Sequence, residues 1–288
     1  MGQEGRFRAA VIQLRSTRDV ATNVESVLTL IDDAARGGAD YILTPENTSL
    51  MELNSKPLFA NTSPEAGNMA LEAFCERAED LGVWLHIGGM PIALSETKVA
   101  NRAFLISPGG EIRARYDKIH MFDVDLPNGE SYRESKNYEP GKKAVLADLT
   151  WGRLGLTICY DLRFPHLHRA LAQAGAEMIA VPSAFTKQTG EAHWHILLRA
   201  RAIETGCFVF AAAQGGFHAC ERATYGHSLI ISPWGEIVAE AGAEPGVIFA
   251  DIDLQEVERA RRRIPALQHD RVFELDSIEP SANMKVAS

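Results

Sequence analysis

The sequence predicts an α/β protein with four layers, in which two sheets pack face to face and helices cover the outer side of each. Short apolar segments alternate along the chain with amphipathic segments of helical length. The second half repeats the order of elements of the first. No stretch rich in serine, glycine or proline marks a linker. We therefore expect one domain over residues 1–288, with a core from about residue 7 to 265 and a tail from 266 to 288.

The first half predicts a βαβ unit followed by a helix, a strand and a hairpin. Apolar residues recur at helical spacing from Val24 to Ala35, between two short apolar segments that favour strands. Proline and glycine at 108–110 indicate the turn of a hairpin. The expected elements are, in order, a strand over 9–14, a helix across 24–35, a strand over 41–43, a helix over about 68–81, a strand over 83–87, and hairpin strands over 102–106 and 112–116.

The second half carries traces of a duplication. The segments ISPGGEI, from Ile106, and ISPWGEI, from Ile231, are identical at six of seven positions. Gly82 and Gly206 each precede an apolar segment, and ILTP at 42–45 corresponds to IAVP at 179–182. Convergence of turn residues is the alternative explanation. Two sheets of comparable size and order would favour duplication.

The amino-acid composition excludes some classes of function and some cellular locations. The 29 Lys and Arg residues against 38 Asp and Glu residues give a net charge of −9, which disfavours general binding to nucleic acid. No apolar stretch approaches the roughly 18 to 20 residues of a membrane span, and Met1–Arg8 carries no secretory signal. The four cysteines, at positions 75, 159, 207 and 220, are too sparse for a disulfide scaffold. We expect a cytoplasmic protein that binds neither nucleic acid nor a membrane.

Cys159 is the first candidate for chemistry. It follows an apolar strand over 154–158 and precedes a helix that begins near Pro165. Such a turn lifts a side chain out of the sheet and points helix amides at it, so we expect the thiolate to be favoured. A small buried core residue is the alternative. A thiol of ordinary pKa, about 8.5, needs a base or a cation beside it to act as a nucleophile.

Two charged residues could supply that environment. Glu46 comes directly after the strand over 41–43 and Pro45, at the sheet edge where Cys159 is expected. Lys118 follows the hairpin strand that ends near Tyr116. Either residue alone could be a surface charge. Together with Cys159, they favour nucleophilic catalysis.

The segments TPE at 44–46, YDKIH at 116–120 and TICYDLRFP at 157–165 resemble the three motifs of the nitrilase-like carbon–nitrogen hydrolases. The motifs occur in the same order, each after a strand, and the resemblance covers almost the whole chain. Segments 189–205 and 225–228 look closest to the Nit branch, which contains deaminated glutathione amidase and ω-amidase. The family has an α-β-β-α sandwich, and its members usually pair through helices and the C-terminal tail. The resemblance therefore implies a homodimer or larger homo-oligomer.

The resemblance also implies roles for individual residues. Cys159 would attack an amide carbonyl, and Glu46 would act first as base and then as acid. Lys118 and the backbone N–H of Tyr160 would stabilise the oxyanion. Glu134 corresponds to the family's further glutamate and would position the substrate or Lys118. Water would then hydrolyse a thioester, with no metal or organic cofactor required.

The sequence predicts the type of reaction more firmly than it predicts the identity of the substrate. Arg163 could bind the carboxylate of a keto-acid amide, or it could brace its turn through Asp161. The preferred substrate is a small linear amide such as deaminated glutathione, with release of ammonia or amine. The alternatives are an N-carbamoyl amine, a nitrile, or no substrate at all in a binding or scaffold relative. Residues 47–56 depart from the aromatic-rich stretch expected of Nit-type amidases, which leaves the pocket shape open.

Other enzyme classes fit the sequence less well. Histidines at 166 and 168, at 193 and 195, and at 218 and 227 beside Cys220 suggest a metal hydrolase. However, helical residues two apart point to opposite sides and no H-E-x-x-H motif occurs, so we expect no metal. The serine-hydrolase motif G-x-S-x-G is also missing.

Two further segments have structural interpretations. The glycine pairs that begin at Gly88, Gly109 and Gly215 lack the G-x-G-x-x-G and P-loop patterns, so we interpret them as short turns that need positive φ or close packing. Val257–Arg263 predicts an amphipathic helix that covers the core or a subunit partner.

Overall fold

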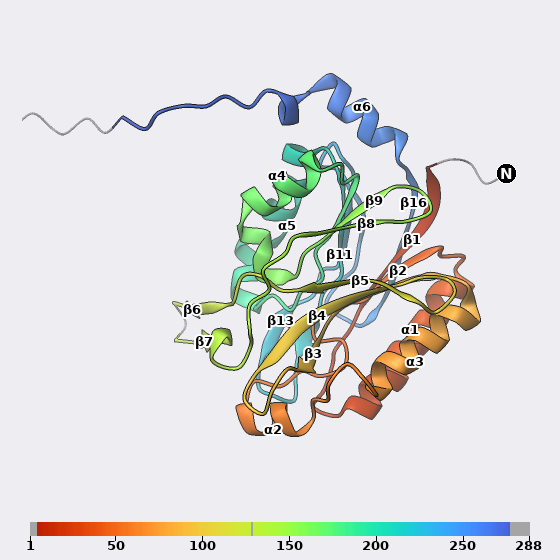
Figure 1. Cartoon of the computed structure of the whole chain (residues 1–288), viewed down its shortest axis with the longest axis vertical. Helices are drawn as coiled ribbons and strands as arrows, with labels where there is room; N and C mark the ends of the chain where they lie inside the picture. Colours follow the sequence, from red (N-terminus) through yellow and green to blue (C-terminus); the bar gives the residue numbers. More distant parts are fainter. Residues whose placement is uncertain (1–4, 128, 277–288) are drawn as a thin grey trace, which may run out of the picture.

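The computed structural model describes residues 5–127 and 129–276, and within them the strands form two six-stranded sheets and two small ribbons. Figure 1 shows helices α1 (Val20–Arg36) and α3 (Met69–Leu81) beside one sheet and α4 (Pro165–Gln173) and α5 (Lys187–Thr205) beside the other. Rings of Tyr41 and Phe210, from different sheets, meet with centroids 5.5 Å apart. The predicted α-β-β-α sandwich is therefore confirmed.

The two sheets have matching strand orders. The first, β16-β1-β2-β3-β4-β5, comprises β1 (Arg6–Gln13), β2 (Tyr41–Leu43), β3 (Trp84–Ala93), β4 (Val99–Ile106), β5 (Ile112–Asp117) and β16 (Gly246–Asp253). The second, β15-β14-β11-β10-β9-β8, comprises β8 (Val145–Asp148), β9 (Arg153–Leu156), β10 (Met178–Ala180), β11 (Phe208–Ala211), β14 (Leu229–Ile231) and β15 (Ile237–Glu240).

Short elements complete the described chain. The ribbons pair β6 (Asp123–Asp125) with β7 (Ser131–Arg133) and β12 (Gly215–Phe217) with β13 (Ala223–Tyr225). The remaining helices are α2 (Ser55–Ala60), α6 (Gln255–Arg263) and the 3₁₀ turns η1 (Glu134–Lys136), η2 (Cys159–Arg163) and η3 (Ala266–Gln268).

Corresponding residues end corresponding helices in the two halves. Gly82 ends α3 with φ 64°, and Gly206 ends α5 with φ 58°. Both adopt the left-handed conformation in which glycine is favoured, and each leads into a central parallel strand. The equal size and order of the sheets thus support the duplication predicted from the sequence.

The central strands are buried on both faces. In β1, Val11 packs between the sheets, whereas Ile12 packs against the outer helices through Ile31 and Phe74. A strand buried on both sides needs apolar residues at successive positions. This explains why the strands appear in the sequence as continuous apolar segments.

Most predicted elements occur where expected, but several strand bounds differ: β1 and β4, for example, each begin three residues earlier than expected. The strand expected to end at Ile87 continues as β3 to Ala93, and β9 ends at Leu156, two residues earlier than expected. The proline and glycine residues at 108–110 do form the hairpin turn, in which Gly110 has φ 75°.

Gly88 and Gly89 lie inside β3, and Gly215 and Gly216 lie inside β12, so the interpretation of these two pairs as turns is wrong. A Cβ atom built on Gly88 would lie 2.0 Å from the Thr44 carbonyl oxygen and 2.2 Å from Pro182 Cβ. Close packing is therefore the reason for glycine at this position. It lets β3 pass between the segments that follow β2 and β10.

The two ends of the described chain lie in one sheet. β16 pairs with β1 along its whole length, from Arg6 opposite Asp253 to Gln13 opposite Gly246. The single domain over residues 1–288 stays a prediction, and residues 1–4 and the part of the predicted tail from 277 to 288 lie outside the described residues. The predicted helix at 257–263 is part of α6, which buries Val257 in the core.

None of the described helices combines the length and the hydropathy needed to cross a membrane.

Candidate active site

Three strand ends meet at one pocket. Glu46 follows β2, Lys118 follows β5 and Cys159 follows β9. All three line the same pocket, and their exposed fractions are 3%, 2% and 6% respectively. The fold thus brings together the three residues predicted from the sequence, from segments that are far apart in the chain.

Lys118 lies between two carboxylates. Its Nζ donates to Glu46 Oε1 at 2.8 Å and reaches both carboxylate oxygens of Glu134 at 2.9 Å. Glu134 opens η1 and also accepts a hydrogen bond from the Phe122 amide at 2.6 Å. Glu134 therefore joins the predicted group and holds the ammonium in place.

Two groups that the sequence analysis missed fix the Glu46 carboxylate. Asn101 Nδ2 donates to Oε1 at 2.9 Å, and the Ala184 amide donates to Oε2 at 2.8 Å. Asn101 lies in β4 without a recognisable motif, and Ala184 contributes only its backbone. No side-chain pattern could have revealed either partner.

Cys159 adopts an unusual backbone conformation. It begins η2 with φ 50°, a left-handed value that costs a non-glycine residue about 1–2 kcal/mol. Its amide donates to the Pro182 carbonyl at 2.9 Å. Pro165 is the first residue of α4, as the sequence predicts.

Asp161 ties the cysteine turn to the lysine segment. It is fully buried and accepts hydrogen bonds from the Ile158 amide at 2.9 Å, the Tyr116 hydroxyl at 2.7 Å and the His120 amide at 3.1 Å. Because both segments share this carboxylate, a shift of one would disturb the other. From the sequence we expected Asp161 only as a possible partner of Arg163.

The protonation pattern differs from the sequence expectation for Cys159. Burial raises the pKa of the Cys159 thiol and the nearby Glu46 carboxylate raises it further, which outweighs the opposing effect of Lys118. The pKa of Glu46 is lowered, because Lys118 outweighs burial. The pKa of Lys118 is raised, because Glu134 and Glu46 outweigh burial. In the resting site these shifts favour a neutral thiol beside an ionised carboxylate and an ammonium, whereas the turn alone favours the thiolate.

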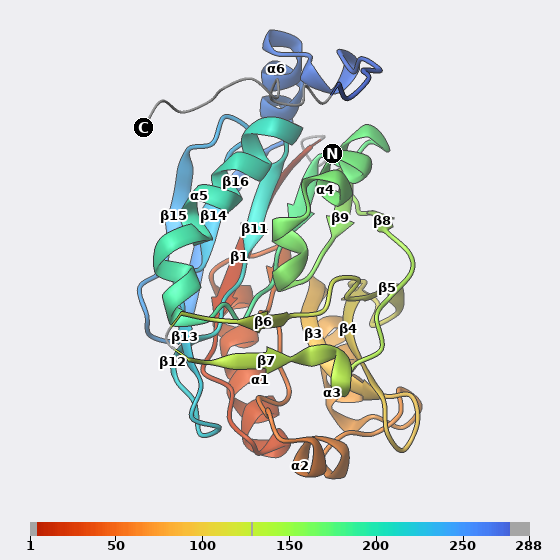
Figure 2. The same ribbon diagram turned by 90° about the vertical axis from the view of Figure 1, so that its left-hand side faces the viewer.

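The pocket opens beside the β6–β7 ribbon, which Figure 2 shows outside both sheets. Its wall includes Tyr160 and Arg163, as predicted. The Arg163 guanidinium donates to His193 Nδ1 at 3.3 Å and lies 5.4 Å from the centre of the Phe185 ring. Bracing of the turn through Asp161 is therefore wrong, since the described partners of that carboxylate do not include Arg163.

Arg222 is a pocket residue that the sequence analysis did not find. Its guanidinium donates to the Ala184 carbonyl and lies 5.3 Å from the centre of the Tyr132 ring. Its buried Nε has no hydrogen-bond partner within the described chain. Arg222 comes from a loop with no recognisable motif, so only the fold could place it here.

Of the histidines considered as metal ligands, His195 and His227 lie close together and the others have separate partners. His193 contacts Arg163, and His168 is buried against the Phe164 carbonyl. Among residues 5–127 and 129–276, the one group of potential ligands close enough to share a metal ion is His195, His227 and Glu240. None of these three lines the pocket.

The fold and the pocket define a class of enzyme, and comparison with known proteins identifies it. Residues 8–262 match the family described as Carbon-nitrogen hydrolase. The chain belongs to the carbon–nitrogen hydrolase family, in the Nit branch of the nitrilase superfamily, and is an enzyme that hydrolyses carbon–nitrogen bonds.

Named relatives lie within that class. The chain is 42% identical over 272 residues to deaminated glutathione amidase from Synechocystis sp., covering 93% of this chain and 98% of the relative. The NitFhit protein of C. elegans superposes with a TM-score of 0.86 at 36% identity, over 93% of this chain and 66% of the other. An amidase variant from Nesterenkonia sp. AN1 that carries the acetamide moiety of fluoroacetamide on its active-site cysteine superposes with a TM-score of 0.77 at 26% identity, over 91% and 97% of the two chains.

Proposed function

We propose that the chain is a cysteine-dependent amidase that hydrolyses a small acidic amide, with deaminated glutathione the preferred candidate, through a thioester on Cys159. The observation that carries this proposal is geometric: Cys159, Glu46 and Lys118 are buried together in one pocket, where the Lys118 ammonium donates to the Glu46 carboxylate at 2.8 Å. The covalent adduct on the active-site cysteine of the Nesterenkonia amidase and the names of the relatives agree with it.

In the first half-reaction, Glu46 accepts the thiol proton as Cys159 Sγ bonds to the amide carbonyl carbon. The charge that develops on the carbonyl oxygen is stabilised by the Lys118 ammonium and the Tyr160 amide. This amide makes no hydrogen bond within the described chain and is free to donate. The carbon–nitrogen bond then breaks, and the leaving nitrogen takes the proton from Glu46.

In the second half-reaction, water hydrolyses the thioester. Glu46 accepts a proton from water as the water oxygen attacks, the carbon–sulfur bond breaks, and the sulfur recovers a proton from Glu46. The Asn101 and Ala184 hydrogen bonds keep the carboxylate aimed through both steps. Glu134 acts as a positioning residue through its contacts with Lys118.

The preference for an acidic substrate rests on two arginines. Arg163 and Arg222 both line the pocket, where the Arg163 guanidinium donates to His193 and the Arg222 guanidinium donates to the Ala184 carbonyl. Arginine presents parallel N–H donors that match a carboxylate. An acidic keto-acid amide would supply such a carboxylate.

A substrate panel tests the proposal. The purified chain is incubated with deaminated glutathione, α-ketoglutaramate, a neutral linear amide, an N-carbamoyl amine and a simple nitrile, and released ammonia or amine is measured. We expect the acidic amides to react fastest and Cys159→Ala to lose at least about 10³-fold in rate. Faster turnover of the carbamoyl amine or the nitrile would replace the proposed substrate. Failure of every compound, with Cys159 unreactive to iodoacetamide, would point to a binding or scaffold protein.

The predicted cytoplasmic location and the predicted homodimer stay predictions. Cell fractionation tests the first, and sedimentation of the full chain tests the second.

A further inference from the structure

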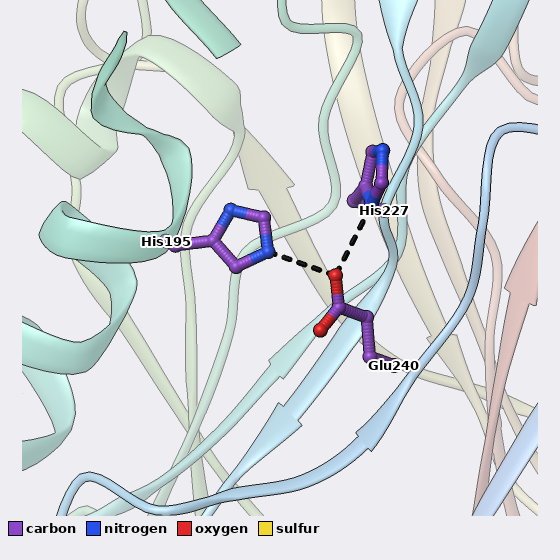
Figure 3. A group of neighbouring side chains, drawn as sticks. All are labelled: His195, His227 and Glu240. Atoms are coloured by element: carbon purple, nitrogen blue, oxygen red, sulfur yellow. Dashed lines mark hydrogen bonds and ion pairs between the residues drawn. The ribbon is translucent and has the colours of Figure 1, made fainter. Parts of the chain in front are cut away.

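Three potential metal ligands converge outside the set of residues that line the pocket. Figure 3 shows the Glu240 carboxylate between the imidazoles of His195 and His227. His195 Nε2 lies 2.9 Å from Glu240 Oε1, and His227 Nδ1 lies 3.1 Å from the same oxygen. The three ligand atoms all lie within 4.8 Å of one another. His195 comes from α5, His227 from the segment before β14 and Glu240 from the end of β15.

We propose that His195, His227 and Glu240 form a binding site for a divalent transition-metal ion, with Zn²⁺ the best match, separate from the amidase pocket. Two imidazoles and one carboxylate are a ligand set that Zn²⁺ accepts with water in the fourth position. Bonds of about 2.0–2.2 Å in tetrahedral geometry place ligand atoms roughly 3.3–3.5 Å apart. The two contacts to Glu240 Oε1, at 2.9 and 3.1 Å, lie close to that separation, and no two of the three ligand atoms are more than 4.8 Å apart.

The backbone that carries these ligands is fixed by its own hydrogen bonds. Trp194, fully buried beside His195, donates through Nε1 to the His227 carbonyl at 2.7 Å. The His227 amide donates to the Gly242 carbonyl at 3.0 Å, two residues beyond Glu240. The His227 backbone is therefore linked by hydrogen bonds to the segment that carries His195 and to the segment that carries Glu240. A preorganised ligand set loses less freedom when it binds an ion.

Two further features suit an ion-binding site. His227 has φ 55°, a left-handed value that an ordinary loop residue avoids, and its ring stacks on Tyr225 with centroids 4.4 Å apart. The side chains of His195, His227 and Glu240 are 29%, 31% and 38% exposed, so an ion from solvent can reach them. A bound ion would clamp α5 to the β14–β15 hairpin.

The proposal is independent of the amidase mechanism and is tested by metal binding. Co²⁺, which replaces Zn²⁺ and absorbs in the visible range, is added to the metal-free full-length chain, and competition with ZnCl₂ gives the zinc affinity. We expect one equivalent of Co²⁺ per chain, with d–d bands and without the intense sulfur charge-transfer bands that a bound thiolate would give. His195→Gln and Glu240→Gln should each weaken binding by more than the about 10- to 100-fold that follows loss of a group that only orients a ligand.

A matched control variant distinguishes metal binding at this cluster from metal binding at other histidines of the chain. His269→Gln removes an exposed histidine outside the cluster and should leave the affinity unchanged. Far-UV circular dichroism verifies that each variant is folded, and Glu240→Gln provides a second test because it preserves the shape of the side chain. Zn²⁺ should raise the melting temperature of the wild type and of His269→Gln but not of the cluster variants. Absence of binding, binding that survives both cluster substitutions, or a sulfur charge-transfer band would overturn the proposal.

Discussion

At the scale of single residues, the chemistry of the pocket depends on which atom holds the proton. Burial disfavours a second negative charge beside Glu46, so the thiol of Cys159 keeps its proton until a substrate carbonyl is in place. Lys118 lowers the pKa of Glu46, so this carboxylate stays ionised more readily than an ordinary glutamate. A base that stays ionised beside a protonated nucleophile is ready to take its proton.

The ionised Glu46 beside Lys118 predicts the pH at which kcat/KM falls on the acid side of its profile. Because the pKa of Glu46 lies below its ordinary value of 4.5, the midpoint of the acid limb of kcat/KM should lie below pH 4.5. Lys118→Met removes the main cause of the lowering, so burial should move the acid limb above pH 4.5. Initial rates after a pH jump measure both profiles. An acid limb unmoved by Lys118→Met would show that Glu46 is not the group that titrates.

The two pocket arginines predict different kinetic effects. Arg163→Met should raise KM for an acidic amide by about 10- to 100-fold, the loss of one charged hydrogen bond, and should leave a neutral amide nearly unaffected. Arg222→Met should also lower kcat, because Arg222 contacts the Ala184 carbonyl and the Ala184 amide holds Glu46. Steady-state kinetics with an acidic and a neutral amide separate the two patterns. Equal effects of Arg163→Met on both amides would remove its role in substrate binding.

At the scale of secondary-structure elements, the ends of strands carry the site, and their packing sets its geometry. β2, β5 and β9 end near one another because parallel and hairpin neighbours align in two matched sheets. The apolar pattern predicted these strands, but it placed the end of β9 two residues beyond Leu156 and the end of the neighbouring β3 at Ile87, inside that strand. Strand ends depend on neighbouring strands as well as on local sequence.

Gly88 offers a test of this packing. Gly88→Ala would force β3 away from the Thr44 and Pro182 segments, and Thr44 lies two residues before Glu46. We expect a loss of about 1–3 kcal/mol in the free energy of unfolding, the usual cost of overpacking, together with a lower kcat. Gly109→Ala is the matched control, because the nearest atom to its new Cβ is Ser107 Oγ at 3.9 Å. Urea unfolding and amide turnover are the measurements, and equal results for the two variants would contradict the packing argument.

At the scale of the whole molecule, buried histidines couple stability to pH. Burial lowers the pKa of His86 to about 3 and of His168 to about 4, so both are neutral in the folded chain. In the unfolded chain, they take up protons near their ordinary value of 6.5. The unfolded state therefore binds more protons between these limits, and stability is lost as the pH falls from 6.5 toward 4.

His168→Gln tests this coupling. Each such histidine contributes a slope of up to about 1.4 kcal/mol per pH unit to the free energy of unfolding, so the variant should show a slope smaller by that amount between pH 6.5 and about 4. Urea unfolding at several pH values gives the slope, which is independent of any constant loss of stability. His269→Gln serves as the control, because this side chain is exposed when the chain is folded. An unchanged slope in His168→Gln would mean that His168 is protonated in the folded state.

The sequence by itself determined the fold class, the order of most elements and the identity of the reactive residues. Apolar periodicity and turn residues report on local conformation, and the TPE, YDKIH and CYDLRFP segments carry their reactive side chains at fixed positions after strands. Only the tertiary structure decided the protonation of Cys159, the roles of Asn101 and Arg222, and the meeting of His195 with Glu240. These features arise from contacts across space, such as the Ala184 amide on Glu46, 138 positions away in the chain. Burial and electrostatic interaction depend on such contacts, and local sequence does not specify them.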